Sequence, residues 1–398
     1  MMGSPKRSST TLEIGTNAPM SAWLSVYLDG IRFVAALIVY LGHVGVARMG
    51  AGPTWMFAPF GQLAVLVFFV LSGLVIGYSV QSRKMSARQY TSARGTRLAS
   101  VVVPTVCITA ILDAVGSRLD PELYRAVDHL LGSGIVSIPA CLTFLNEAWG
   151  ANIHLGSDDS YWSMGYEVPY YALFGVWCFS RGRTRVLACV LLAIAVGPSI
   201  MALFPTWLLG VAVWYLIRGY RPSPVTGAVM CLGSLFGAIL LTVWVAANLD
   251  YLTTANSLAS HNREQMIVDY LMSGLFGLHI WGFSGFGARL PFDPGVFGAV
   301  VRWLAGGSFT LYLLHLPLVL FVRACLPNGI PNLTYYTAIV CLPFVAAYAI
   351  AEFTERRKAV WRDAVERAID IVERILVRVQ SSPAMSARSQ NTNGGNPT

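Results

Sequence analysis

Residues 59–80 read PFGQLAVLVFFVLSGLVIGYSV, a stretch that contains no charged side chain. A helix that crosses a bilayer needs about 20 predominantly apolar residues, so this stretch predicts a transmembrane helix. Ser72 and Gly73 lie near its middle. Small residues of this kind let two membrane helices approach closely, which makes this point a candidate helix-packing contact.

The composition of the whole chain points to the same class of protein. The chain has 398 residues, of which 55% are hydrophobic and 12% charged, and its mean hydropathy is +0.58. A soluble domain carries about 25% charged residues, so a soluble enzyme, a disordered protein and a coiled coil are excluded. The seven cysteines are odd in number and form no CxxC motif, so we expect neither a disulfide framework nor a metal site.

Apolar segments recur along the rest of the chain and predict an all-α, polytopic membrane helix bundle of about ten transmembrane helices. The segments are 26–47, 59–80, 98–116, 161–179, 186–201, 203–217, 225–247, 266–284, 302–324 and 334–352.

The distribution of charge predicts the orientation of this bundle. The net charge is +8, and the basic residues gather in alternate loops, whereas the loop 117–160 holds six acids against Arg118 and Arg125. Cytoplasmic loops carry an excess of Lys and Arg, so both termini are expected in the cytoplasm and 117–160 outside. Without a soluble basic face, no nucleic-acid partner is expected.

Two assignments in this topology are open. Segments 186–201 and 203–217 are short, and the break between them rests on Gly197-Pro198 and Pro205. A single span there would reverse every later loop. The stretch 129–147 is fairly apolar, but its glycines and proline make it a poor spanning helix. We expect it outside, lying on the bundle.

The two ends of the chain differ from the membrane domain, residues 23–354. Residues 1–22 predict a disordered cytoplasmic leader, because they are polar and lack the apolar region of a signal peptide. Residues 355–379 have apolar residues at helical spacing among charges, which indicates a basic amphipathic helix on the inner membrane surface. A solvated helix that packs on the protein's own loops fits equally well. Residues 380–398 predict a disordered tail.

Ionisable residues inside the first span are candidate functional residues, because charge in a membrane is costly. Arg32 and His43 are eleven residues apart, so both project from one helix face, separated by roughly 16 Å along the axis. Asp29 is one turn before Arg32 and is placed to pair with it. The structural alternative is that Arg32 snorkels to the inner surface while His43 makes a helix contact.

Glu167 is the acid well inside the span 161–179. Counting from the span ends places His43 and Glu167 at one level toward the outside, and Arg32 and Ser72 toward the cytoplasm. A histidine with a carboxylate is the usual general-base arrangement, in which the acid orients the ring. A structural Glu167, satisfied by Tyr or Trp hydrogen bonds, is the alternative.

The inner loop 81–97 is rich in arginine. Arginines here suit the binding of a phosphorylated ligand, but they also fit a loop that is basic simply because it is cytoplasmic.

These segments together resemble the acyltransferase-3 family of bacterial integral-membrane acyltransferases. The matching motifs are Leu28-Asp29-Gly30-x-Arg32 with His43, Phe68-Phe69-Val70-Leu71-Ser72-Gly73, Tyr161-Trp162-Ser163 through Glu167 to Tyr170, Tyr312-Leu313-Leu314-His315-x-Pro317, and Glu355-Arg356. They run in order through most of the chain.

The resemblance implies residence in the bacterial inner membrane and transfer of an acyl group, usually acetyl. The donor would be cytoplasmic acetyl-CoA and the acceptor a hydroxyl of a cell-surface polysaccharide, a lipid-linked sugar or a related molecule. It assigns His43 to catalysis, Arg32 to the acyl donor, and Arg94 and Arg97 to the donor loop. The acidic outer loop is expected to help select the acceptor.

We therefore predict three groups of site residues. His43 is the general base and Glu167 orients it, although a covalent acyl-His43 intermediate remains an alternative. Acyl-donor binding is assigned to Asp29, Arg32, Ser72, Arg94 and Arg97. Substrate binding is assigned to Trp162, Ser163, Tyr170, Tyr312 and His315. His315, two residues before Pro317, could instead simply hold a kinked helix.

Two other classes of function fit a membrane bundle with buried polar residues. One is a transporter of a sugar or small anion, although no repeated halves are visible in the sequence. The other is a sensor or scaffold whose basic tail binds a partner, which leaves Arg32, His43 and Glu167 unexplained. Dependence on acetyl-CoA separates the enzyme from both.

Overall fold

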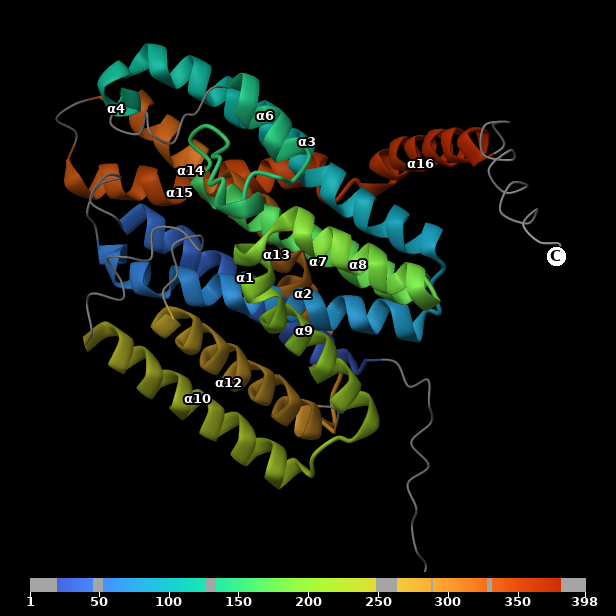
Figure 1. Ribbon diagram of the computed structural model, residues 1–398. Helices are drawn as coiled ribbons and strands as arrows, with labels where there is room; N and C mark the ends of the chain where they lie inside the picture. The colour runs from blue at the N-terminus through green and yellow to red at the C-terminus, as the bar shows by residue number, and fades with distance from the viewer. Residues whose placement is uncertain are drawn as a thin grey trace, which may run out of the picture.

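The computed structural model describes residues 20–45, 53–125, 134–247, 263–287, 289–327 and 331–380. In these ranges the regular structure is helical, and an isolated bridge between Leu155 and Asp158 is the sole strand-like pairing. The chain forms a bundle of long helices (Figure 1), which confirms the all-α prediction. The predictions for residues 1–19 and 381–398 fall outside the described residues.

The elements follow one another in a single series. They are α1 (Ala22–Gly45), η2 (Pro53–Phe60), α2 (Gly61–Ser82), α3 (Ala87–Leu119), α4 (Pro121–Arg125), α6 (Gly134–Leu142), η3 (Ala148–Gly150), η4 (Asp159–Tyr161), α7 (Trp162–Phe179), α8 (Gly182–Val196), α9 (Pro198–Gly219), α10 (Pro224–Ala247), α12 (Arg263–Gly287), α13 (Gly295–Ala305), α14 (Ser308–Cys325), α15 (Asn332–Phe353) and α16 (Lys358–Gln380).

Each of the ten predicted segments corresponds to one of these helices. Within the described ranges, eight helices are long and apolar enough to cross a membrane, namely α1, α2, α3, α9, α10, α12, α14 and α15. Two predicted segments, α7 and α8, are not among the eight; α8 has 15 residues. The chain is therefore a multi-pass membrane protein.

The contact between α2 and α9 depends on two glycines. A Cβ at Gly73 would lie 2.0 Å from the carbonyl oxygen of Trp207, and one at Gly210 would lie 1.9 Å from that of Val70. No side chain fits at such distances, so the backbones pack directly against each other. The predicted packing contact at Gly73 is confirmed, and it brings α9 against Ser72.

The chain between residues 186 and 217 forms two helices. The break falls at Gly197, whose φ of 87° favours glycine, and Pro198 follows at the first position of α9. Pro205 lies inside α9, so the expectation that it contributes to the break was wrong. α8 packs on α7, while α9 packs on α2.

The basic segment 81–97 is largely helical rather than a loop. Ser86 caps α3 through a capping box with Gln89, and the helix then continues through Arg94 and Arg97 into the apolar part of the bundle. The arginines of this segment are therefore held at fixed positions on α3.

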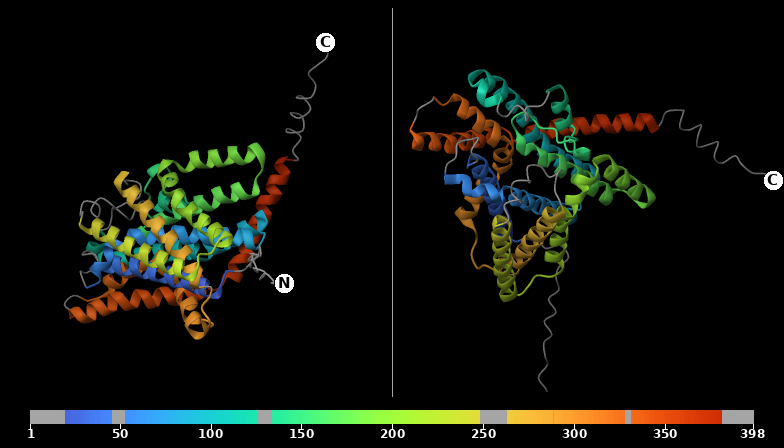
Figure 2. Two further views of the ribbon diagram at one scale, coloured as in Figure 1. Left: turned by 90° about the horizontal axis from the view of Figure 1, so that it is seen from below. Right: turned by 60° about the vertical axis from the view of Figure 1, so that its left-hand side comes forward.

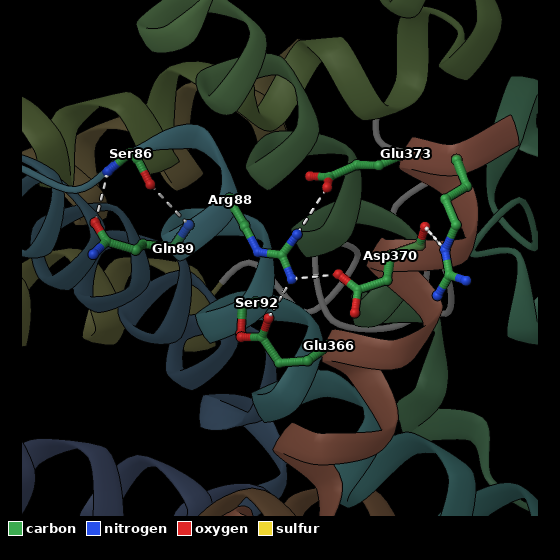
Figure 3. A network of polar contacts seen from close by, with 8 residues as sticks. Ser86, Arg88, Gln89, Ser92, Glu366, Asp370 and Glu373 are labelled. Atoms are coloured by element: carbon green, nitrogen blue, oxygen red, sulfur yellow. Dashed lines mark hydrogen bonds and ion pairs between the residues drawn. The ribbon is translucent and has the colours of Figure 1, made fainter. Parts of the chain in front are cut away.

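The helix α16 packs on this N-terminal part of α3 and crosses the end of the bundle (Figure 2). Arg88 donates hydrogen bonds to Glu366, Asp370 and Glu373 (Figure 3), and Val365 faces Gly95. The predicted amphipathic helix thus packs on the protein's own residues, which was the second of the two expected arrangements.

Candidate active site

A cavity of about 50 Å³ lies between α1, α2, α3, α7 and α14. Its charged and polar lining side chains are Arg32, Ser72, Arg94, Arg97, Ser163, Glu167, Tyr171, Ser308 and Tyr312. The structure therefore brings together four of the five residues predicted to bind the donor, and adds Glu167 and Tyr171. A cavity of this size holds a few water molecules.

Three guanidinium groups define one end of this cavity, which we call the arginine end. Arg32 donates a hydrogen bond of 2.8 Å from Nη1 to Asp29 Oδ1, as the spacing of the two residues predicted. Arg97 lies over the ring of Phe309, 5.4 Å from its centroid. Among the described residues, Arg94 Nε has no hydrogen-bond partner although it is buried. Such a group is available to bind an anion such as a phosphate.

Two residues beyond the last predicted span join the arginine end. Glu355 is 6% exposed and accepts hydrogen bonds of 3.2 and 3.3 Å from the backbone N–H and the hydroxyl of Thr310. Burial raises the pKa of Glu355, and the nearby Arg97 opposes this shift. Burial, followed by repulsion from Arg97, lowers the pKa of Lys358. The start of α16 therefore brings a lysine close to the three arginines, whose positive charges disfavour its own.

Glu167 lies at the level of Ser72, not at that of His43. Its Oε1 accepts a hydrogen bond of 2.7 Å from the Ser72 hydroxyl and another from the Tyr171 hydroxyl. Trp207 Nε1–H donates to Ser72 Oγ at 3.2 Å. The carboxylate is thus held by α2, α7 and, through Ser72, α9.

The predicted pairing of Glu167 with His43 is therefore not what the structure contains. The depth count assumed that α7 begins at the membrane surface. Instead, Ser160 is 2% exposed and its hydroxyl lies 3.4 Å from His315, so the segment that precedes α7 enters the bundle before α7 starts. Seven residues separate Ser160 from Glu167, which places the carboxylate roughly 10 Å deeper.

His43 instead pairs with His315. His43 Nδ1 lies 2.8 Å from His315 Nε2, and the rings stack with centroids 5.0 Å apart. His315 Nδ1 lies 2.7 Å from the carbonyl oxygen of Tyr312, which can only accept, so Nδ1 carries the proton. In neutral His315, Nε2 then accepts from His43 Nδ1–H. This assignment leaves a lone pair on His43 Nε2, the atom that a general base uses.

The residues predicted to bind the acceptor divide into two groups. Ser163 and Tyr312 line the cavity. Tyr170 donates a hydrogen bond of 2.8 Å to the carbonyl of Ile200, Trp162 packs edge-on against Tyr166, and His315 is fully buried beside His43. None of these three lines the cavity.

The cavity extends from the arginine end to the neighbourhood of the histidine pair. Tyr312 is three residues before His315 on α14, and Ser163 is three residues after Ser160. Residues at this spacing are neighbours on a helix, so the cavity ends about one turn from His315, the partner of His43. Sequence reasoning missed Tyr171, although its position four residues after Glu167 was a usable signal. Lys358 and Ser160 carried no such signal.

A comparison with protein families identifies the family of the chain. The family model Acyl_transf_3, described as an acyltransferase domain, matches residues 25–352. No curated protein and no solved structure matches the chain. The matched region includes Arg32, His43, Glu167 and His315, and it covers most of the chain. The chain therefore belongs to the membrane acyltransferase family that this domain defines.

Proposed function

We propose that the protein is an O-acetyltransferase that uses acetyl-CoA from the cytoplasm and acetylates a hydroxyl of a cell-surface polysaccharide or a lipid-linked sugar. One observation carries the proposal: a single cavity is lined by three arginines and by Tyr312, which lies three residues before His315, the partner of His43. The arginine end suits the phosphates of coenzyme A. A base near the other end would meet the arriving acyl group.

In the reaction, His43 Nε2 removes the proton from the acceptor hydroxyl. The hydroxyl oxygen attacks the thioester carbonyl carbon, a C–O bond forms and the C–S bond breaks. The thiolate of coenzyme A then takes the proton from His43, so the base is restored. His315 holds His43 in the required tautomer throughout, since its Nε2 accepts the Nδ1–H. A covalent acyl-His43 intermediate would use the same Nε2 lone pair.

The arginine end would bind the donor. Arg94 has an unpaired buried Nε, and Arg97 and Arg32 have Glu167, Asp29 and Glu355 among their electrostatic partners. These carboxylates keep the guanidinium groups in place before the donor arrives. Because the cavity measures about 50 Å³, binding of an acyl-pantetheine arm requires its lining side chains to move apart.

The experiment uses purified full-length protein, radiolabelled acetyl-CoA and a panel of cell-surface glycans, with His43→Ala beside wild type. We expect His43→Ala to lower transfer by about a thousand-fold, as loss of a general base does, and to keep acetyl-CoA binding. Retained binding and an unchanged elution profile control for folding. Wild-type turnover by His43→Ala would refute the mechanism. Label trapped on wild-type protein, and absent from the variant, would select the covalent route.

A further inference from the structure

A second cavity, of about 350 Å³, lies between α1, α2, α10 and α12. It shares a wall with the first, because Val67 on α2 lines the larger cavity while its neighbour Phe68 lines the smaller. Most of its lining is aliphatic or aromatic, including Val34, Ala64 and Ala238. The α10 and α12 helices pack against each other on the far side (Figure 1).

The polar side chains that line this cavity already have partners. His279 Nδ1 lies 3.1 Å from the carbonyl oxygen of Cys231 and therefore donates to it, so Nε2 accepts from the Tyr27 hydroxyl. The hydroxyls of Ser234 and Thr242 donate to backbone carbonyls at 3.0 and 2.8 Å. The hydrogens of these groups are already donated and the rest of the lining is apolar, so the chemistry that fits the cavity best is hydrocarbon.

The cavity reaches the lateral surface of the bundle. Val34 on α1 is 51% exposed, Leu235 on α10 is 50% exposed, and both line it. They lie on helices long and apolar enough to cross a membrane, so the medium outside this rim is lipid. A hydrocarbon chain can therefore enter the cavity directly from the bilayer, since lipid tails are as apolar as the lining.

The two ends of the cavity differ. Tyr27 lies on the part of α1 near the arginine end and is bonded to His279 on α12. Phe60 lies at the opposite end, in η2, and η2 packs on the turn of α1 that carries His43. A Cβ at Gly42 would lie 3.0 Å from the carbonyl oxygen of Phe57, which shows how close the two segments are.

We propose that this cavity holds the hydrocarbon chain of a lipid whose polar head, which bears the acceptor hydroxyl, lies beside η2 and the turn of α1 that carries His43. The acceptor role of the head rests on the function proposed above. The chain fills the apolar space between α1 and α10, and the head lies away from Tyr27 and His279, whose hydrogens are already donated to His279 and to Cys231.

The test is photolabelling of the full-length protein in phosphatidylcholine nanodiscs with dodecyl glucosides. One glucoside carries a diazirine on the chain, and the other carries it on the sugar. We expect the chain label on α10 and α12 peptides near Ala238 and the sugar label on residues 53–60. Ala238→Trp, which fills the cavity, should lower chain labelling at least tenfold. Leu232→Trp, on the same helix and 69% exposed, should leave it unchanged.

Two outcomes would overturn the inference. One is chain label spread evenly over lipid-facing helices, or unaffected by Ala238→Trp. The other is sugar label near Tyr27, which would place the head at the wrong end. The labelling requires no turnover, so a wild-type protein that fails to transfer acetyl groups would refute the proposed function and leave this result intact.

Discussion

The two cavities on either side of the α1–α2 pair differ in how their polar groups are used. On one side, Arg94 keeps an unpaired Nε and Arg32, Arg97 and Glu167 line a common space. On the other side, the polar groups are bonded to one another around His279. A polar residue in a span is costly in either case. The contrast indicates that a polar residue in a span marks a reactive site where one of its hydrogen-bonding atoms is not used within the protein.

The histidines illustrate this most directly. His279 is a satisfied core residue, because its two ring nitrogens have partners in Cys231 and Tyr27. His315 is equally satisfied, but one of its partners is His43. Within the described residues, His43 bonds through Nδ1 alone. The bond of His315 to a backbone carbonyl therefore fixes the tautomer of His43 and leaves the Nε2 lone pair for a proton.

The largest expected effect concerns His315, and it tests whether the two cavities differ in their role. We expect His315→Leu to lower kcat by about 100-fold with an unchanged KM for acetyl-CoA, because His43 loses the acceptor that fixes its tautomer. His315→Gln should recover part of kcat, since an amide oxygen can accept from His43 Nδ1–H. His279→Leu, on the other side, should keep kcat and change the KM for the acceptor. Equal losses of kcat in His315→Leu and His279→Leu would show that the two histidines do not differ in their role in the reaction.

A smaller effect is expected at the arginine end. Arg97→Gln removes a charge-assisted bond to the donor phosphates and should raise the KM for acetyl-CoA about tenfold, with little change in kcat. Arg88→Gln is the matched control, because Arg88 lies on the same helix but bonds to α16. An identical KM shift in both variants would show that general electrostatics, not the cavity, attracts the donor. Steady-state kinetics at two salt concentrations separates these outcomes.

Much of the fold follows from local pattern. Apolar length predicted the helices that are long and apolar enough to cross a membrane, and the helical spacing of apolar residues predicted α16. Gly197-Pro198 marked the turn between α8 and α9, because a positive φ followed by a proline at N1 is a local property. The helical extent of α3 was missed, since its polar first turns lack apolar periodicity and are stabilised by the Ser86 capping box and by α16.

The site was predictable where it depends on one helix. The Arg32–Asp29 bond follows from a spacing of three residues on α1. The His43–His315 pair joins residues 272 positions apart, and the position of Glu167 depends on how far the outer segment enters the bundle. Neither follows from spacing along a helix. Depth counted from span ends therefore fails where an outer segment is itself buried.

The smallest expected effect tests whether the apolar side is structural rather than reactive. Tyr27→Phe removes the hydroxyl that donates to His279 Nε2 and leaves a buried acceptor unpaired, which costs about 1–3 kcal/mol. We expect a melting temperature lower by a few degrees and an unchanged kcat. Tyr78→Phe makes the same chemical change on α2, where the ring packs against Trp214, and should leave the melting temperature close to that of wild type. A kcat loss in Tyr27→Phe at unchanged stability would mean that the His279 network takes part in the reaction, and that the α1–α2 wall does not separate a reactive side from an inert one.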